Sequence, residues 1–260
     1  MFPRLSIEVS AFHQALQKKF LIDSVRLEID RTKCRNCGTC ISACPNKIIK
    51  RGHPDPAPRN KSDKKPVSVL LDAKNCSYCG TCAYLCPYDA LSLVVDGKKV
   101  ERDELQLVMK KALPRLVEEE VTLKDGSKAR KFMDGYLKYD KDTCQDGCSM
   151  CAEACPTGTI VRYSMLKSTY SGSSPTTGWK LEYLRHQWGP EALEIHRENC
   201  IQCGACAFTC PVSAMQIVRQ KINAKGEFQD PFWPDTVKRL LDYHTQEPER
   251  VSKKVAKNVK

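Results

Sequence analysis

The sequence predicts an α+β fold built from two tandem units that carry insertions. One cysteine-rich motif recurs four times, and the four copies account for all sixteen cysteines of the 260-residue chain. A short run of alternating or β-branched apolar residues stands before and after each copy, which indicates strands. A helix-like segment separates the first two copies from the last two. The repeats therefore fall into two pairs, and each pair is expected to fold as one unit.

We expect five segments in chain order. They are an N-terminal arm over 1–24, a first unit over 25–97, a helix-and-hairpin linker over 98–134, a second unit over 135–220 and a C-terminal extension over 221–260. Units this small bury little apolar surface of their own. Folding should therefore be coupled to insertion of the group that the cysteines bind.

The expected strands flank the motifs in the same way in both units. Those before the motifs are Val25–Ile29, Val67–Leu71, Gly135–Tyr139 and Leu193–His196, and those after them are Lys47–Ile49, Ala90–Val95, Thr159–Tyr163 and Ala214–Val218. Each unit thus contains strand, cysteine loop, short helix and strand, twice over. This order predicts two halves related by a pseudo-twofold axis.

The segments outside the repeats have weaker patterns. Near-helical spacing of apolar residues predicts a short amphipathic helix over 11–20, covering the first unit. A second helix is expected over 101–120, followed by a hairpin over 121–132 on the turn Asp125-Gly126. A further helix is expected over 235–244, and the tail from Val251 is expected to be loose.

Two insertions interrupt the units. Residues 51–66 hold four prolines and five basic residues, which predicts an exposed loop. The second insertion, 164–192, starts with a Ser/Thr/Gly loop and continues with Trp179, Tyr183 and Trp188. These aromatic side chains either pack within the unit or form a subunit interface, where tryptophan is a common anchor.

Three of the four motifs share one spacing, and the third copy differs from it by one residue. The four motifs are Cys34, Cys37, Cys40, Cys44; Cys76, Cys79, Cys82, Cys86; Cys144, Cys148, Cys151, Cys155; and Cys200, Cys203, Cys206, Cys210, each with a proline after the fourth cysteine. The pattern C-x2-C-x2-C-x3-C-P is typical of bacterial [4Fe–4S] ferredoxins, so the chain resembles a polyferredoxin. The third copy has one extra residue, and Ser149 replaces the glycine that follows the second cysteine elsewhere.

The resemblance implies two ferredoxin-like 2[4Fe–4S] units with four clusters in all. In two-cluster ferredoxins the fourth cysteine of each motif serves the other cluster. Carried over to this sequence, the ligand sets are Cys34, Cys37, Cys40 and Cys86; Cys76, Cys79, Cys82 and Cys44; Cys144, Cys148, Cys151 and Cys210; and Cys200, Cys203, Cys206 and Cys155. No catalytic residue is expected, because the clusters carry the reactivity.

Two other interpretations of the cysteines are disfavoured. An even number is compatible with a disulfide framework in a secreted chain. However, the N-terminus lacks the basic start and apolar run of a signal peptide. Zinc ribbons use two well-separated C-x2-C pairs, whereas each motif here places four cysteines in one loop and turn. We therefore expect reduced, metal-binding thiols in a cytoplasmic protein.

The formal net charge of +11 would suit nucleic acid or another acidic partner. Four oxidised clusters with their thiolates contribute about −8, which leaves a net charge of about +3. A nucleic-acid partner is therefore not expected. No stretch reaches the length of apolar sequence that crosses a membrane.

Among polyferredoxins, the chain most resembles the multi-cluster ferredoxin subunits of formylmethanofuran dehydrogenase from methanogenic archaea. The resemblance rests on the aspartate that precedes the motifs, on Cys86-Pro-Tyr-Asp-Ala-Leu and Cys155-Pro-Thr-Gly-Thr-Ile, and on the helix-Leu-Pro spacer at 104–117. This chain has fewer repeats than the long subunit of that family. The resemblance implies electron transport in anaerobic metabolism such as methanogenesis. Its implied partners are a catalytic oxidoreductase subunit and other iron–sulfur subunits of a larger complex.

Two other functions stay open. One is a free-standing electron carrier with no fixed partner. The other is a radical enzyme, because Cys144-x3-Cys148-x2-Cys151 taken alone is the spacing that binds S-adenosylmethionine at an open cluster iron. Cys155, at the ferredoxin position, and Cys210, available as the fourth ligand, argue against the radical enzyme.

The position four residues before each motif differs between copies. It holds Asp30, Asp72 and Asp140, and in the last copy His196. We expect these residues to end a strand, with the aspartates accepting hydrogen bonds from nearby backbone N–H groups. The alternative is that their charge acts on the adjacent cluster and that the histidine raises the potential of the last one.

Overall fold

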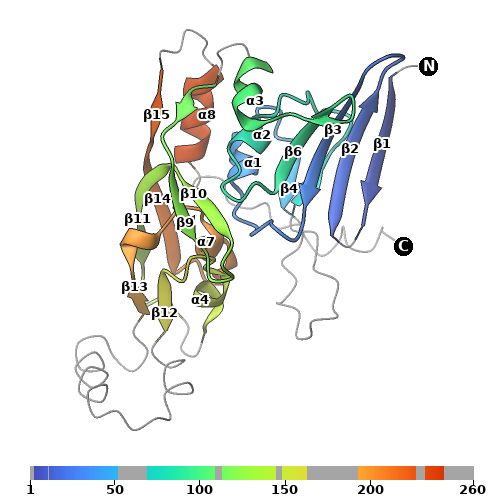
Figure 1. The fold of residues 1–260 in the computed structure, drawn as a ribbon. Coiled ribbons are helices and arrows are strands. Elements are labelled where there is room, and N and C mark those ends of the chain that lie inside the picture. Colours follow the sequence, from blue (N-terminus) through green and yellow to red (C-terminus); the bar gives the residue numbers. More distant parts are fainter. Residues whose placement is uncertain are drawn as a thin grey trace.

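A computed structural model describes residues 3–10, 12–51, 69–108, 113–144, 148–162, 193–226 and 232–242. The predicted loop over 51–66, the insertion with Trp179, Tyr183 and Trp188, and the tail from Val251 lie outside these ranges, apart from Arg51. Figure 1 shows two lobes, one formed around the N-terminal sheet and one around the C-terminal strands.

The two units repeat one order of elements. The first contains β3 (Ser24–Asp30), α1 (Thr39–Ala43), β4 (Ile49–Arg51), β5 (Val69–Leu71), α2 (Thr81–Tyr84) and β6 (Leu91–Val95). The second contains β11 (Met133–Tyr139), α4 (Met150–Ala154), β12 (Ile160–Arg162), β13 (Leu193–Ile195), α7 (Ala205–Thr209) and β14 (Met215–Ile222). A 3-10 turn, η1 (Arg197–Asn199), follows β13. The eight flanking strands predicted from the sequence are confirmed, and β4 begins two residues later than expected.

Strand pairing crosses in the same way in both units. The strand before the first motif pairs antiparallel with the strand after the second, as β3 with β6 and as β11 with β14. The strand after the first motif pairs with the strand before the second, as β4 with β5 and as β12 with β13. Apolar residues face each other in these pairs, for example Leu27 opposite Leu93 and Leu137 opposite Ile217. The predicted twofold relation between motifs therefore arises from the pairing.

The cysteine loops share one backbone form. Gly38, Gly80 and Gly204, which follow the second cysteine, have φ of +78°, +77° and +91° and stand at the start of a short helix. Such left-handed angles favour glycine, which lacks a Cβ. In the third copy Ser149 takes this place with φ of −109°. The residue three positions after the fourth cysteine is left-handed in all four copies: Lys47, Asp89, Gly158 and Ser213.

The N-terminal arm corrects the sequence prediction, because it forms no helix over 11–20. It forms the antiparallel strands β1 (Arg4–Val9) and β2 (His13–Lys19), and β2 pairs with the free edge of β3. Pairing along the edge of the sheet satisfies the backbone groups of β2 and buries Leu16. These gains favour a strand over the helix that the weak apolar spacing predicted. With β7 (Lys98–Lys99) the sheet has the order β1-β2-β3-β6-β7.

The linker also differs from expectation in one part. A helix was expected over 101–120, but α3 covers Arg102–Val108 and strand β8 (Arg115–Leu116) follows. β8 pairs with β15 (Ala224–Lys225) from the C-terminal extension. Pro114 cannot continue a helix, and its carbonyl accepts a hydrogen bond from the buried Tyr84 hydroxyl instead. The predicted hairpin on Asp125-Gly126 is confirmed as β9 (Glu119–Thr122) and β10 (Lys128–Lys131).

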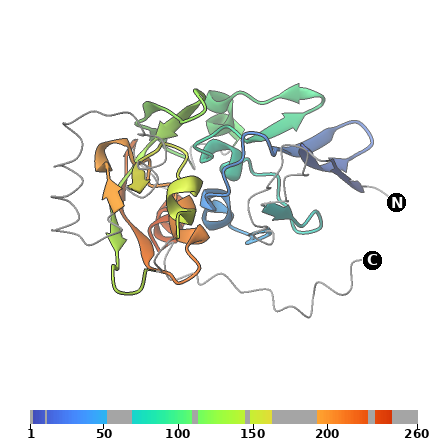
Figure 2. The same cartoon turned by 90° about the horizontal axis from the view of Figure 1, so that it is seen from below.

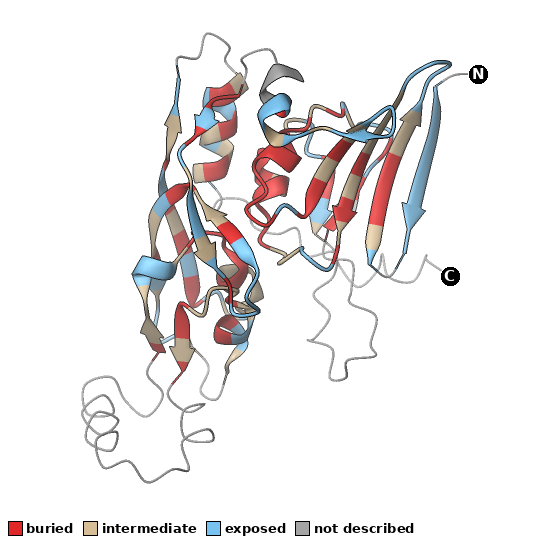
Figure 3. Cartoon of the chain, in the orientation of Figure 1, coloured by how far each residue is buried: buried red, intermediate tan, exposed pale blue. Residues whose placement is uncertain are grey.

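Helix α8 (Phe232–Leu241) joins the two units. It begins three residues before the expected start, buries Trp233 and Leu240, and packs on α1 of the first unit. Arg239 donates a hydrogen bond to the Ser42 carbonyl at 3.2 Å. Figure 2 shows α1 at the boundary with the second lobe. The buried positions in Figure 3 run from the N-terminal sheet through α1 and α2 into α8. In the described part of the chain, no helix is long and apolar enough to cross a membrane.

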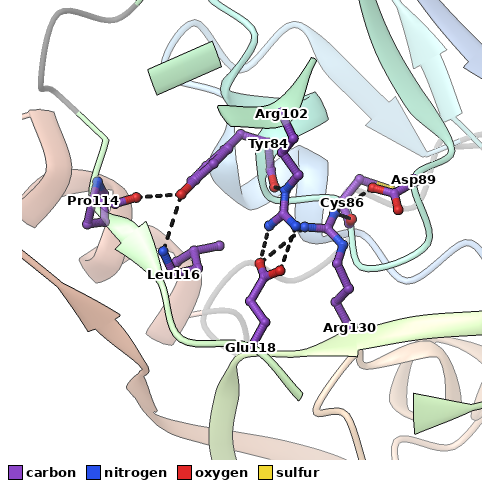
Figure 4. Close-up of polar contacts among 8 residues, drawn as sticks. All are labelled: Tyr84, Cys86, Asp89, Arg102, Pro114, Leu116, Glu118 and Arg130. Atoms are coloured by element: carbon purple, nitrogen blue, oxygen red, sulfur yellow. Dashed lines mark hydrogen bonds and ion pairs between the residues drawn. The ribbon is translucent and has the colours of Figure 1, made fainter. Parts of the chain in front are cut away.

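A charged network ties the linker to the second motif, as Figure 4 shows. Glu118 accepts hydrogen bonds from Arg102 and from Arg130, and its side chain is 23% exposed. Arg130 also donates to the Cys86 carbonyl and lies 2.8 Å from an Asp89 carboxylate oxygen. Tyr84 completes the junction by bonding the linker backbone at Pro114. The linker is thus fixed against the segment that carries Cys86.

Replacing Glu118 with alanine is expected to lower stability by about 2 kcal/mol, because Arg102 loses its carboxylate and Arg130 keeps only the more exposed Asp89. This corresponds to a fall of about 4–8 °C in melting temperature, measurable by anaerobic circular dichroism. The matched control is Glu120→Ala, which removes an exposed pair with Lys128 and should cost about 0.5 kcal/mol or less. Equal losses in the two variants would contradict a structural role for this network.

Candidate metal-cluster sites

All sixteen cysteines lie in the described part of the chain, and none of them forms a disulfide. The disulfide framework considered from the sequence is therefore absent. Nine of these side chains are buried and seven are half-buried. Thiols of this number, reduced and shielded together, form a donor set for soft metal centres.

Strand pairing brings the cysteines of each unit into two crossed groups. Because β3 pairs with β6, the segment that ends at Cys86 returns to the loop that begins at Cys34. Because β4 pairs with β5, Cys44 lies beside the loop that begins at Cys76. The second unit repeats this with β11–β14 and β12–β13. The fold itself therefore exchanges the fourth cysteines.

Electrostatic contacts between thiols identify the groups. We name them quartet A (Cys34, Cys37, Cys40, Cys86), quartet B (Cys44, Cys76, Cys79, Cys82), quartet C (Cys144, Cys148, Cys151, Cys210) and quartet D (Cys155, Cys200, Cys203, Cys206). In each quartet one thiol, Cys40, Cys82, Cys151 or Cys206, has a pKa that is raised first by burial and then by the charges of the other three. The structure thus brings together the same four sets that the ferredoxin resemblance implied.

Quartets B and C each line a hollow in the structure. Quartet B encloses one with about 320 Å³ of empty space, partly open to solvent, together with Leu27, Ile49 and Tyr78. Quartet C encloses about 310 Å³ with Tyr139, Leu193 and Met215. Among the described residues, no group of three or more Cys, His, Asp or Glu side chains is arranged for a single metal ion.

Burial makes the thiols difficult to ionise without a cation. Burial first, and the neighbouring thiols second, raise the pKa of Cys86 and of Cys203 to about 12 and that of Cys151 to about 11. The pKa values of Cys40 and Cys82 are also raised well above the ordinary value, by the same causes. Thiolates so placed require a positively charged metal centre to stabilise them. The donor set therefore fits an iron–sulfur cluster.

Hydrogen bonds from the chain reach several sulfurs. Backbone N–H groups donate to Cys76 at 3.4 Å and to Cys86 at 3.3 Å. The hydroxyl groups of Thr81 and Thr157 lie 3.3 and 3.5 Å from the sulfurs of Cys79 and Cys155, whereas the Thr39 hydroxyl accepts from the Cys37 thiol at 3.4 Å. Burial raises the pKa of Cys155, but bonds from Thr157 and from backbone N–H groups more than offset this and lower it. Such bonds favour the thiolate and tune a cluster's potential.

The position before each motif behaves as expected for its aspartates. Asp30, Asp72 and Asp140 end their strands and accept hydrogen bonds from backbone N–H groups two residues on, at 2.9–3.0 Å. His196 lies between two glutamates, 3.7 Å from Glu194 and 3.6 Å from Glu198. The expectation that these aspartates accept hydrogen bonds from nearby backbone N–H groups is therefore confirmed. An effect of this position on cluster potentials stays a prediction.

The cysteine spacing does not identify the arginines that hold the loops. Arg51 donates to the Cys37 carbonyl at 3.4 Å, and the buried Arg219 donates to the Cys203 carbonyl at 2.8 Å. A Cβ at Gly38 would meet the Arg51 guanidinium, which would have to shift, and the φ of +78° favours glycine there. Arg51 and Arg162 occupy the same place in copies one and three, seven residues after the fourth cysteine. A comparison of the repeats beyond their cysteines could have found this pair.

Comparison with known proteins supports the assignment of the repeats. Residues 33–90 and 144–214 match the 4Fe–4S dicluster domain family. A stretch of 89 residues is 29% identical to a Staphylococcus haemolyticus protein named as a formate dehydrogenase. That match covers 34% of this chain and 8% of the relative, so the chain spans a small part of the relative's length.

A solved structure shares the fold. One chain of the formate dehydrogenase–heterodisulfide reductase–formylmethanofuran dehydrogenase complex from Methanospirillum hungatei superimposes with a TM-score of 0.68 at 20% identity. The superposition covers 93% of this chain and 92% of that chain. At this identity the likeness establishes the fold alone. Together with the family matches, it confirms the prediction of ferredoxin-type dicluster domains with mixed helix and strand.

The crossed quartets predict which cysteine variants lose the same cluster. Cys44→Ala and Cys82→Ala should give matching spectra, because both residues belong to quartet B. Cys40→Ala and Cys86→Ala should match each other, because both belong to quartet A. Electron paramagnetic resonance of the reduced variants, with iron content measured in parallel, compares the pairs. If Cys44→Ala instead matches Cys40→Ala, the fourth cysteine serves its own motif and the crossed assignment is wrong.

Proposed function

We propose that this ferredoxin-type chain is an electron-transfer subunit that relays single electrons through four [4Fe–4S] clusters. The gathering of sixteen reduced cysteines into four crossed quartets is the observation that carries the proposal. When bound, each cluster supplies a carrier that takes up and releases one electron without bond chemistry. Quartets A, B, C and D are the proposed ligand sets.

In this proposal the chain's own residues hold the clusters in position, shield them from solvent and adjust the charge around them. The crossed strand pairs hold the two quartets of a unit next to each other, with α1 packed on α2 and α4 packed on α7. Cys82 of quartet B lies near enough to contribute to the raised pKa of Cys40 in quartet A. Backbone and threonine donors at the sulfurs set how readily each site accepts an electron. No side chain is proposed to make or break a substrate bond.

An exposed apolar surface favours a bound subunit over a free carrier. Strand β1 is exposed along its whole length, and Leu5, Ile7 and Val9 on one of its faces are 44%, 53% and 62% exposed. Phe12, Leu21 and Ile22 add to the apolar surface of the same hairpin and the loop after it. Clustered apolar side chains of this kind mark interaction surfaces, and an edge strand can pair with a partner.

The relatives suggest the class of partner. One is named as a formate dehydrogenase, and the shared fold comes from a complex that contains formate and formylmethanofuran dehydrogenases. We infer that the chain carries electrons between a catalytic dehydrogenase subunit and other iron–sulfur subunits of such a complex. A formylmethanofuran dehydrogenase complex in the cytoplasm, in methanogenesis, is the specific form of this proposal.

Quartet C bears on the radical-enzyme alternative. A radical enzyme needs an open iron beside three cysteine ligands, whereas Cys210 lines the same hollow as Cys144, Cys148 and Cys151. A fourth thiol at that position argues for a closed site.

Anaerobic purification of the tagged chain from its source cells tests the subunit proposal, and a dehydrogenase subunit is expected to co-purify. Isolation of the chain alone, at full yield and fully loaded, would favour the free carrier.

The proposal predicts a fixed cofactor content. Protein purified without oxygen should contain about sixteen iron and about sixteen acid-labile sulfide per chain and should take up about four electrons on reductive titration. The reason is that each quartet supplies the four thiolates of one cluster. A firm value near twelve iron would show that one quartet is not a complete site. Quartet C is the expected exception in that case, since its loop departs from the others at Ser149.

A further inference from the structure

The linker hairpin β9–β10 lies between the two units and enters their shared core. Its apolar residues Leu123 and Ala129 are 5% and 2% exposed. They belong to the hydrophobic core that also holds Cys86 of quartet A and Cys203 of quartet D. The polar groups of the hairpin bond segments that carry cysteines of both units. One element outside the repeats therefore contacts the surroundings of both quartets.

Two backbone hydrogen bonds hold the hairpin against the units in the same way. The Arg130 N–H group donates to the Pro87 carbonyl at 2.9 Å, and the Lys124 N–H group donates to the Pro156 carbonyl at 2.8 Å. These prolines directly follow the fourth cysteines of the second and third motifs. Those two cysteines are the crossed ligands of quartets A and D.

The side chains of the same two residues add a second bond on each side. The Arg130 guanidinium donates to the Cys86 carbonyl, as Figure 4 shows, and the Lys124 ammonium donates to the Ala152 carbonyl at 2.7 Å. Ala152 lies in helix α4, three residues before Cys155. Hydrogen bonds from a charged donor are roughly twice as strong as neutral ones. Each cation therefore fixes the turn that presents a fourth cysteine.

Two further contacts of the hairpin follow the same division. Asp125, at the turn, forms an ion pair with Arg35, which stands next to a quartet A ligand in the first motif. Lys131 donates to the Glu198 carbonyl at 3.3 Å, two residues before the fourth motif begins with a quartet D ligand. The hairpin thus bonds two ligand segments of quartet A and two of quartet D.

The hairpin is short and closed, so the bonding sites on it have a set separation. Arg130 stands opposite Glu120 in the paired strands. The turn is closed by a hydrogen bond from the Leu123 N–H group to the Ser127 carbonyl at 2.8 Å. Lys124 and Arg130 therefore lie on the two sides of one tight turn. The segments that they bond are held at a distance that this turn determines.

We propose that hairpin β9–β10 is a bridge that holds quartets A and D at a fixed separation, with Lys124 and Arg130 as its positioning residues. This inference rests on the proposed function. A relay from one unit to the other needs one pair of sites held in position across the boundary. The bridge makes quartets A and D that pair. An electron that enters either unit crosses to the other between these two sites.

The double variant with Lys124→Met and Arg130→Met tests the bridge, because it removes both charged donors and keeps aliphatic stems of similar length. Electron paramagnetic resonance of the fully reduced chain measures the magnetic interaction between neighbouring clusters, which weakens as the clusters move apart. The interaction between quartets A and D should be weakened or lost. The interactions of A with B and of C with D should remain, because the strand pairs within each unit are unchanged.

Two cysteine variants assign the interaction. Cys40→Ala removes the quartet A cluster, and Cys206→Ala removes the quartet D cluster. The part of the wild-type interaction that is lost in both variants is the one between quartets A and D. Absence of this part from a wild-type chain that holds all four clusters would contradict the inference.

Two controls separate the bridge from a loss of stability. Lys128→Met changes another lysine of the hairpin, whose partner is the exposed Glu120, and it should leave the interaction between quartets A and D in place. Glu118→Ala removes another partner of Arg130 but leaves the bond to the Cys86 carbonyl. It should lower the melting temperature without weakening that interaction.

The single variants decide the case in which the double variant does not fold. Lys124→Met should then weaken the interaction between quartets A and D by itself, and Lys124→Arg, which keeps a cation at the site, should retain it. Full cluster content with an unchanged interaction, in the double variant or else in Lys124→Met, would overturn the bridge and leave the relay intact. A wild-type chain that fails to hold four clusters would overturn the proposed function itself.

Discussion

The crossing of strand pairs within each unit is the constraint on which the rest of the structure depends. Each fourth cysteine is followed by a strand that pairs beside the neighbouring motif, so one motif cannot complete a quartet alone. The two quartets of a unit are therefore formed together. This arrangement links folding to metal content, since the buried thiols stay protonated until a positively charged metal core stabilises their thiolates. It also keeps the two sites of each unit adjacent, which electron relay requires.

The contact between units is of a different kind. It is made by side chains outside the cysteine motifs, namely Arg51, which lies over the Phe208 ring, and Arg239, which bonds the Ser42 carbonyl, and by helix α8, which packs on α1. One hydrophobic core holds Cys37 and Cys86 of quartet A with Cys203 of quartet D, and a second core holds Cys151 of quartet C with Cys155 and Cys206 of quartet D. Repetition alone would give two separate ferredoxin units. Helix α8 and the arginines join the two units, so that the four sites form one series.

Much of the site and less of the fold could be predicted from the sequence. Thiolate ligands need a fixed loop spacing, so the four motifs could be read from the cysteine pattern, and the flanking strands followed from alternation. The crossed exchange of the fourth cysteines was implied by the ferredoxin resemblance and not by the spacing. The arm over 11–20 was expected to be a helix, because its pairing with the edge of β3 is a tertiary effect that local spacing does not record. The predicted helix over 101–120 extends past α3 into strand β8. Pro114 cannot continue a helix, and its carbonyl accepts a hydrogen bond from the Tyr84 hydroxyl instead. The contact of Arg51 with Phe208 lies between units, and no local pattern reveals it.

The central claim is that four clusters stand in one sequence across the boundary, in the order B, A, D, C. Anomalous X-ray scattering at the iron edge, from crystals grown without oxygen, tests it most directly. The account predicts four compact iron sites, each surrounded by one crossed quartet, with the sites of quartets A and D as neighbours between the other two. Fewer than four iron sites, a site held by one motif alone, or a wide separation of quartets A and D would contradict it.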